Sequence, residues 1–554
     1  MEGFTATHLP IVREYAHRMG LVEIVDKALA GGMHTAPGTV LLGLVMNLLS
    51  GRSPLYRVEE FFGARDVALL LEKGITSERL NDDVIGRVLD RVHEYGTWKI
   101  FSEVCVQAFR NFSVDCSVVH QDTTSVSLWG EYAPEPGDPV HITYGFSKDK
   151  RPDLKQFVLS LLCVEGNLPV HGGILDGNAS DKKINGSIIA ELPRIMSRHR
   201  VEDIIYVADS ALVTEENLSL MGGGIPFVSR LPENFTACRS LISKSVAGGV
   251  WQDAGHLSNR TLKGKNVCAR YRLNEEHIEL YGRTYRALVV HSDAHDRRRQ
   301  KRIDRAIRHD AIAVHNKVKE LARKEFFCLP DAQSAAQDLK DGSLHQLSFS
   351  FENRLVYHRG RPDKNGVRRV KEVRHRVSVK VSENLEAVER LREEAGCFVL
   401  LTTVPPEKKS GVEILRIYKD QDGIERNFAF LKDPLFVNDV FLKKPHRIEA
   451  MGLVLVLSLL LWRLMERTMR KKGKESKIVL TGWNNRQTDK PTSFMMISKF
   501  SSLFVGVDNG KRFLFTPFNK VQLAYLNALD VSPAVFTEFH AAGYSRRLPI
   551  PMLS

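Results

Sequence analysis

Two short stretches of the sequence place an aspartate at the predicted end of a buried strand. One is 118–125, VVHQDTTS, which contains Asp122, and the other is 204–210, IIYVADS, which contains Asp209. In each, a β-branched apolar run leads into the aspartate, and small hydroxyl residues follow it. Because such a run is typical of a buried strand, we expect both carboxylates to lie where their strands emerge from a sheet.

A third acidic residue, Glu425, lies in a helical pattern much further along the chain. Tyr418, Gln421, Glu425 and Lys432 are separated by two, three and six residues, and Phe428 falls at helical spacing between the last two. Two strand-end aspartates and one helical glutamate form an all-oxygen ligand set, which suits a hard cation such as Mg²⁺. Two such ions can clamp the attacking and leaving oxygens of a phosphodiester.

The composition is that of a globular chain with a polyanionic partner. The 554 residues are enough for two to four domains, and the net charge of +13 favours nucleic acid as that partner. The seven scattered cysteines show no zinc or disulfide spacing, which predicts a reducing cytoplasm. The apolar stretch 450–462 is too short to span a membrane, so it predicts a buried core helix and no membrane partner.

Changes in the apolar pattern divide the chain into five predicted regions. The first region is helical and serves either as scaffold or for DNA recognition. A later region, the β-rich insertion, carries basic runs that form either a solvated face or a DNA contact. The regions are a helical N-terminal region (1–112), the first part of an α/β core (113–228), a β-rich insertion with a basic helical arm (229–396), the last part of the core with the helix of Glu425 (397–470), and a C-terminal region without an assigned role (471–554).

The first part of the core shows a recognisable order of elements. We expect strands at 114–119, 157–164, 170–175 and 204–208, with a helix from about Lys183 that is broken or kinked near Pro193. Three strands, a helix and a strand is the opening order of a ribonuclease H-like α/β fold.

At these residues the chain resembles bacterial DDE transposases of the insertion-sequence-four superfamily. The signature of that group is Tyr-(2)-Arg-(3)-Glu-(6)-Lys, and Tyr418, Glu425 and Lys432 match it in identity and spacing, whereas Gln421 replaces the arginine. The stretch 144–156 is similar to the Ser-Lys-Asp-Arg-Pro-Asp-Leu-Lys-Gln segment of one branch. The residues HRIEA just before the apolar stretch are also family-like. The similarity runs from about residue 8 to 470.

The resemblance implies a ribonuclease H-like catalytic core interrupted by a β-strand-rich insertion, with a helical N-terminal DNA-binding domain. It implies that Asp122, Asp209 and Glu425 are the catalytic residues and hold two Mg²⁺ ions, for which Mn²⁺ can substitute. The implied activity is cleavage at the ends of an insertion sequence and strand transfer into target DNA. The implied partners are double-stranded DNA, as terminal inverted repeats and target, and a second copy of the chain in a homodimeric DNA complex at the bacterial nucleoid.

The remaining signature residues are predicted to contact DNA. Lys432 would hold a phosphate as a point charge, with a plain surface lysine as the alternative. Tyr418 would support DNA near the cut, and Gln421 cannot supply the cation of the arginine it replaces. Two residues compete for site roles: Asp176 follows a predicted strand and rivals either aspartate, whereas His120 is expected to be a core histidine.

Two further functions stay open from the sequence. One is a DNA-binding relative that has lost catalysis, to which the Gln421 change could have contributed, although three intact carboxylates argue against it. The other is a ribonuclease H-like nuclease that cleaves without strand transfer.

Overall fold

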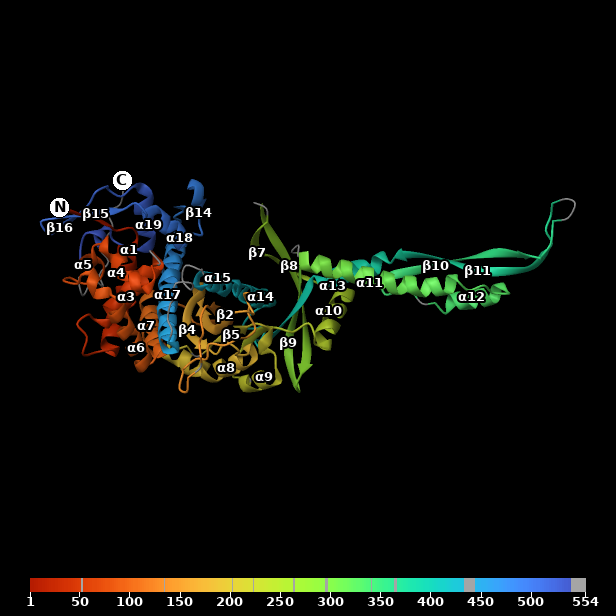
Figure 1. Ribbon diagram of the computed structural model, residues 1–554, viewed down its shortest axis with the longest axis horizontal. Coiled ribbons are helices and arrows are strands. Elements are labelled where there is room, and N and C mark those ends of the chain that lie inside the picture. The colour runs from red at the N-terminus through yellow and green to blue at the C-terminus, as the bar shows by residue number, and fades with distance from the viewer. Residues whose placement is uncertain are drawn as a thin grey trace. The chain divides into compact units, whose positions relative to one another are not determined.

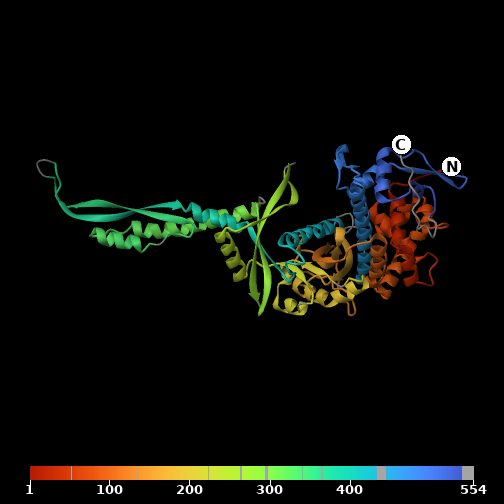
Figure 2. The same cartoon turned by 180° about the vertical axis from the view of Figure 1, so that it is seen from behind.

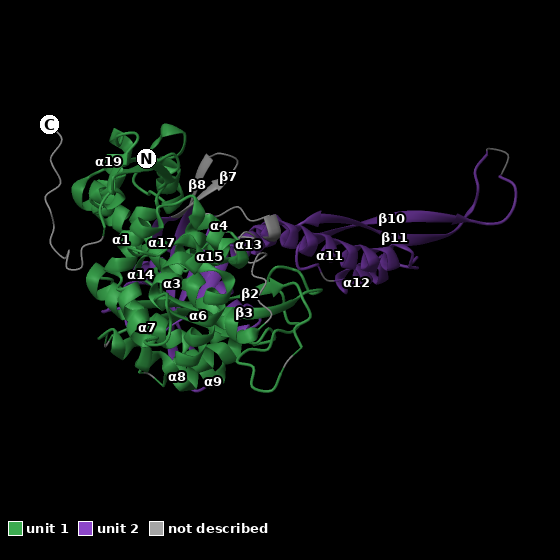
Figure 3. Ribbon diagram, turned by 60° about the vertical axis from the view of Figure 1, so that its left-hand side comes forward, with its two compact units in different colours: residues 1–229, 417–554 green, residues 230–416 purple. Residues whose placement is uncertain are grey.

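The computed structural model describes residues 1–50, 53–133, 135–201, 203–222, 224–262, 265–293, 297–339, 341–362, 366–432 and 444–539. The chain is a mixed α/β protein with a helical N-terminal region, which confirms the predicted class. It divides into two compact units, shown in Figure 3. Unit 1 comprises residues 1–229 and 417–554, and unit 2 comprises residues 230–416.

Unit 1 begins with the short strand β1 (Glu2–Thr5) and a group of helices. The helix α3 is apolar on all sides and completely buried, as expected for a helix at the centre of a bundle. The helix α6 has a capped start, since the Asn81 side chain accepts a hydrogen bond from Val84 N at 3.0 Å. The helices are α1 (Leu9–Arg18), α2 (Leu21–Ala28), α3 (Pro37–Leu49), α4 (Val58–Gly63), α5 (Val67–Leu70), α6 (Asp82–Tyr95) and α7 (Thr97–Phe112).

A mixed sheet follows, in the strand order β4-β3-β2-β5-β6 within unit 1. The neighbours β4, β3 and β2 are antiparallel, whereas β2, β5 and β6 are parallel. The helix α8 connects β4 to β5, and Pro193 lies inside it without ending it. The elements are β2 (Val118–Leu128), β3 (Lys155–Val164), β4 (Leu168–Leu175), α8 (Asp181–Arg198), β5 (Ile205–Ala208), α9 (Glu215–Met221) and β6 (Phe227–Arg230).

Three of the four predicted core strands are confirmed to within a few residues, but the strand predicted at 114–119 is wrong. The strand β2 starts at Val118 and continues to Leu128. The Asp115 side chain accepts hydrogen bonds from the backbone N and the hydroxyl of Ser117, which holds the preceding residues in a turn. The polar half of β2 is stabilised as a strand by antiparallel pairing with β3, a non-local effect that apolar periodicity does not report.

The long helix α17 (Pro445–Ser476) forms the centre of unit 1. It packs against β4 and against α3, α6, α7 and α19, and Figures 1 and 2 show it between the N-terminal helices and the sheet. By length and composition it could cross a membrane, but 94 % of its apolar window is buried inside the protein. The prediction of a core helix at 450–462 is therefore confirmed, and the helix extends well beyond that range.

The C-terminal region, which has no predicted role, completes the core of the N-terminal helices. Its strand β15 pairs with β1 in the three-stranded sheet β1-β15-β16. The Tyr15 hydroxyl donates to Leu529 O at 2.9 Å, and the buried Arg13 donates to Val535 O at 2.8 Å. The elements are β13 (Leu480–Thr481), β14 (Gln487–Thr488), α18 (Ser493–Phe500), β15 (Phe504–Asp508), β16 (Lys511–Leu514) and α19 (Lys520–Leu529).

Unit 2 contains the strand-rich part and the basic helix predicted for the insertion. Its strands lie in the order β12-β9-β8-β7, with a separate two-stranded ribbon of β10 and β11. The structure groups β12 with this unit, whereas the sequence suggested that the core resumes there. The elements are α10 (Thr236–Gly248), β7 (Gln252–Leu262), β8 (Lys265–Leu280), β9 (Arg283–Ser292), α11 (Arg297–Ala322), α12 (Leu329–Gln337), β10 (His345–Tyr357), β11 (Val370–Glu383), α13 (Leu385–Ala395) and β12 (Cys397–Thr402). Unit 2 ends at residue 416, within the helix α14 (Gly411–Asp420). The helix α15 (Asp422–Leu431) follows in unit 1.

Candidate active site

Parallel pairing of β2 with β5 brings Asp122 and Asp209 together. His120 pairs with Val207, and each aspartate lies two residues further along its chain. Because side chains alternate along a strand, the two carboxylates project from the same face of the sheet. Asp209 directly follows β5, as predicted. Asp122 instead lies inside β2, opposite Leu161 of β3, at the point where the pairing with β5 has ended.

The two carboxylates lie in an environment that disfavours their charged forms. Burial raises the pKa of Asp122 to about 6, and the nearby charges of Asp209 and Asp181 raise it as well, while Lys148 and the backbone N of Thr123 oppose the shift. Burial also raises the pKa of Asp209, with a contribution from Asp181. Carboxylates that repel each other in a poorly solvated place are stabilised by a cation.

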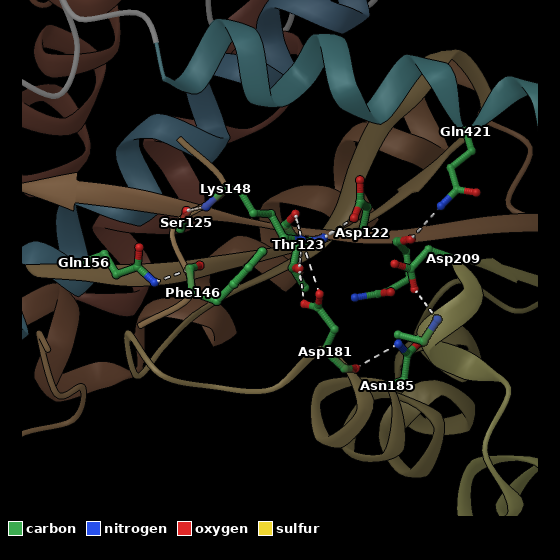
Figure 4. Close-up of polar contacts among 12 residues, drawn as sticks. Asp122, Thr123, Ser125, Phe146, Lys148, Gln156, Asp181, Asn185, Asp209 and Gln421 are labelled. Carbon is green, nitrogen blue, oxygen red and sulfur yellow. Dashed lines mark hydrogen bonds and ion pairs between the residues drawn. The ribbon is translucent and has the colours of Figure 1, made fainter. Parts of the chain in front are cut away.

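Lys148 and Asp181 belong to this group of charges, although the sequence did not single them out. The Lys148 ammonium donates to Thr123 O at 2.8 Å and to Thr123 Oγ1 at 2.7 Å, and it lies 3.4 Å from an Asp181 carboxylate oxygen. Thr123 Oγ1 in turn donates to Asp181 at 2.5 Å. Figure 4 shows these side chains around Asp122 and Asp209. Lys148 lies in the family-like stretch 144–156, which was the available signal, whereas Asp181 had none.

The loop that carries Lys148 is held on the sheet by close backbone contacts. Lys148 N donates to Ser125 Oγ at 2.9 Å, and the buried Gln156 amide donates to Gly177 O at 2.7 Å and to Phe146 O at 3.3 Å. A Cβ atom on Gly145 would overlap Gly177 O. The glycine is therefore needed for the approach of this loop to the end of β4.

Gln421 points at the site from the start of α15. Its side-chain amide donates to Gln121 O, the residue before Asp122, at 3.4 Å, and Figure 4 shows it directed toward the two aspartates. Glu425 lies one helical turn further along α15, and its side chain is exposed. The structure therefore brings the helix of Glu425 to the strand of Asp122, but the described contacts do not place the Glu425 carboxylate in the group formed by Asp122, Asp181 and Asp209.

The other end of α15 is also fixed close to the Lys148 loop. The Lys432 ammonium forms an ion pair with Asp149 at 2.6 Å, and Asp149 adjoins Lys148. Glu425 thus lies between two residues that hold α15 in place. Gln421 contacts the strand β2, and Lys432 contacts the loop of Lys148. Tyr418 lies in the preceding helix α14 and is half-buried.

The two rival residues have structural roles in this fold. Asp176 is partly exposed, accepts a hydrogen bond from His141 N at 2.7 Å and lies 3.4 Å from the His141 ring, so it links the segment of His141 to the end of β4. His120 is buried on β2, and burial lowers its pKa to about 4. His120 is thus a core residue, as the sequence predicted.

The carboxylate oxygens of Asp122 and Asp209 are ligands that suit a hard cation. Asp122 and Asp209 offer carboxylate oxygens whose negative charges are poorly compensated, as their raised pKa values indicate. Across the part of the chain that the structure describes, no three His, Cys, Asp or Glu side chains converge in a group that could hold a metal ion. The Glu425 side chain is exposed, and none of the described contacts joins it to the aspartates.

A family model matches the N-terminal region of the chain. Residues 4–106, which correspond to β1 and the helices up to most of α7, match the model of a family described as a domain of unknown function (DUF4277). No curated protein matches the chain. The N-terminal helices are thus similar to a recurring domain, which carries no assigned activity.

Proposed function

We propose that this chain is a DNA transposase that cleaves the ends of an insertion sequence and transfers the strand into target DNA with the help of divalent cations. The observation that carries the proposal is the position of Asp122 and Asp209, two residues beyond the paired His120 and Val207 on adjacent parallel strands. Their convergence was predicted from two separate stretches of sequence and depends on the pairing of those stretches in the fold.

The arrangement of unit 1 supports assigning its sheet to the ribonuclease H-like class. Three antiparallel strands lead through the helix α8 to two parallel strands, in the order β4-β3-β2-β5-β6. The chain then departs into unit 2 and returns through α14 and α15, which carry or flank the signature residues. An insertion at this point is the organisation that the resemblance implies for the transposase family.

Asp122 and Asp209 would hold the cations, with Glu425 as the third ligand contributed by α15. Bound Mg²⁺ would supply a more acidic water or hydroxyl nucleophile and stabilisation of the leaving 3′-oxygen. The protein would contribute two adjacent interior strands, β2 and β5, that fix the first two carboxylates. The helix α15 would bring Glu425 to them, since it is already anchored at Gln421 and Lys432.

Charged side chains around the aspartates would orient the DNA backbone. Lys148 offers a cation beside Asp122, where a phosphate could take the place of part of its present hydrogen bonding. Lys432 would exchange its ion pair with Asp149 for a phosphate. Gln421 provides no charge, and its amide instead stabilises the contact between α15 and β2. The partners would be double-stranded DNA and a second copy of the chain.

The proposal is tested with purified protein, Mg²⁺ and a duplex that carries the terminal repeats flanking the gene. We expect cleavage at the element end and joining to a target duplex by the wild type. The Asp209→Asn variant should lose at least about 100-fold in cleavage rate. The Asp176→Asn variant is the matched control and should cleave at the wild-type rate, because its carboxylate contacts His141 and not the aspartates of the site.

Each of the other possible results would contradict the proposed site or favour a different function. Equal cleavage by wild type and Asp209→Asn would rule out the proposed site. Binding of the repeats without cleavage by any of the proteins would favour the inactive DNA-binding relative. Cleavage that is never followed by joining would favour a nuclease.

A further inference from the structure

The ribbon of β10 and β11 continues beyond the helices that cover its base. Near the base, one face of the ribbon carries apolar residues that pack on α11 and α12, with Leu321, Ala332 and Val377 in the buried cluster. Figures 1 and 3 show the two strands running past the end of these helices. We define residues 353–362 and 366–376 as the outer ribbon.

The outer ribbon keeps the apolar face but loses its cover. Leu355 pairs with Val373, and Tyr357 pairs with Val370, so these four side chains share one face. Their exposed fractions are 45 %, 38 %, 42 % and 45 %, respectively. An exposed apolar face of this kind on a β-ribbon indicates a binding surface.

The same segment is strongly basic. It contains eight arginine and lysine residues and a single acidic residue, Glu372. Arg354 and Arg376 both contact Glu325, and Arg374 pairs with Glu372. The five other cations are exposed and form no ion pair with any residue that the structure describes; they are Arg359, Arg361, Arg368, Arg369 and Lys371.

We propose that the outer ribbon is an arm that binds duplex DNA in the major groove. A two-stranded β-ribbon fits that groove, whereas the major groove of an RNA duplex is too deep and narrow for it. The unpaired arginines at the tip would contact phosphates, and Leu355 and Val373 would make apolar contacts with base edges such as thymine methyl groups. The choice of DNA as the partner rests on the proposed function, while the place of contact rests on the charge of the ribbon itself.

A second copy of this chain is a less suitable occupant. In a symmetric dimer the same surface would meet itself, so the five uncompensated cations of one ribbon would face those of the other. Like charges that close together oppose association. The polyanionic DNA backbone relieves the same repulsion, because each phosphate contact releases counterions.

The test removes four tip charges from the full-length protein by the substitutions Arg359→Ser, Arg361→Ser, Arg368→Ser and Arg369→Ser. The matched control removes four exposed lysines of unit 1, by Lys73→Ser, Lys99→Ser, Lys471→Ser and Lys474→Ser. Binding is measured by fluorescence anisotropy, without divalent metal, on a duplex of about 30 base pairs, roughly three turns of DNA. Its sequence is unrelated to the terminal repeats, and the salt concentration is varied.

We expect the tip variant to bind about 10- to 100-fold more weakly than the wild type, with a salt dependence lower by about 2–4 ion equivalents. The control should lose much less. Wild-type affinity and salt dependence in the tip variant, or an equal loss in the control, would overturn the proposal. Because cleavage is not measured here, failure of the arm is distinguishable from failure of the Asp209 site.

A second variant separates the two possible occupants of the apolar face. Leu355→Ser with Tyr357→Ser should weaken binding of the same duplex, and sedimentation of the metal-free protein should show an unchanged oligomeric state. If this variant dissociates an oligomer and leaves DNA affinity unchanged, the surface binds a second copy and the DNA arm is overturned.

Discussion

Asp122 is held where its negative charge is unfavourable, because it is buried beside two other carboxylates. Its pKa in the folded protein is about 6, above that of an unfolded aspartate. The folded state therefore retains the proton more strongly, so the stabilisation from this group is complete below about pH 4 and is lost as the pH rises through about 6. A buried carboxylate with a raised pKa reduces the stability of the free folded protein at neutral pH. Its charge no longer reduces that stability when a bound ligand compensates it.

The substitution Asp122→Asn should consequently stabilise the metal-free protein while abolishing cleavage. At pH 7 we expect a gain in the free energy of unfolding on the order of 1 kcal/mol, since Asn keeps the shape of the side chain without its charge. The gain should disappear below about pH 4, where the wild-type carboxyl is protonated. Urea unfolding at the two pH values measures it. A destabilised variant at pH 7 would contradict the electrostatic description of the site.

At the scale of elements, the position of α15 depends on a close contact with the turn between β3 and β4. A Cβ atom on Gly423 would overlap the side-chain amide of Asn167, and Asn427 donates to Asn167 O at 2.8 Å in the same contact. The helix that presents Gln421, Glu425 and Lys432 is thus positioned by a residue without a side chain.

The substitution Gly423→Ala should displace α15 and reduce both stability and cleavage. We expect a loss of about 1–3 kcal/mol in the free energy of unfolding, as for overpacking in a well-packed contact. The second substitution Asn167→Gly removes the overlapping amide and suits the positive φ of 61° at that position, so the double variant should recover most of the loss. Chemical unfolding and cleavage rates of the four proteins form the double-mutant cycle. Additive losses would show that the two residues do not interact.

In addition to the apolar cluster, a carboxylate on α11 forms hydrogen bonds with the base of the ribbon. Asp310 accepts hydrogen bonds from Ser343 N, Leu344 N and His345 Nδ1 at 3.0, 2.9 and 2.9 Å. Burial alone would raise its pKa, but these hydrogen bonds outweigh it and hold the pKa at about 2. A lowered pKa contributes stability that is present above about pH 4 and is lost as the pH falls through about 2.

The substitution Asp310→Asn should loosen this attachment at neutral pH. We expect unit 2 to lose about 1 kcal/mol of stability at pH 7, and we expect this difference from the wild type to shrink as the pH falls through about 2. Amide hydrogen exchange at the start of β10 measures the local effect. Unchanged protection of Leu344 and Leu347 at pH 7 would exclude this role.

The elements that the sequence predicted well are those whose burial follows from a local run of apolar residues. The run at 204–208 is apolar and β-branched and forms a strand, and the stretch at 450–462 is apolar throughout and forms the central helix. The position of Asp209 followed from the first of these. Lys148 and Asp181 were missed because they reach Thr123 through contacts 25 and 58 residues apart in the chain, and no periodic pattern encodes such a distance.

At the scale of the molecule, the two ends of the chain form one core. Arg512, on β16, forms an ion pair with Asp66 at 2.6 Å, and both side chains are at least nine-tenths buried. Asp66 also accepts a hydrogen bond from Leu69 N at the start of α5. The C-terminal region thus stabilises the N-terminal helices through a contact between residues 446 positions apart in the chain.

The substitution Arg512→Ala should destabilise unit 1 by about 3 kcal/mol, because it leaves the buried Asp66 carboxylate without its partner. The further substitution Asp66→Asn should restore part of the loss, since the amide oxygen can still accept from Leu69 N and no charge is left unpaired. Thermal unfolding of the three proteins measures both effects. An Arg512→Ala variant as stable as the wild type would show that the C-terminal contact is dispensable.

The central position of α17 also determines when the protein can fold during synthesis. The sheet strands β2 to β6 leave the ribosome long before residues 445–476, so the apolar side of β4 stays without its helix while all of unit 2 is being translated. Chaperones that shield exposed apolar chains would act during that interval. A nascent chain thus carries both aspartates long before it carries the helix that completes the core around their sheet.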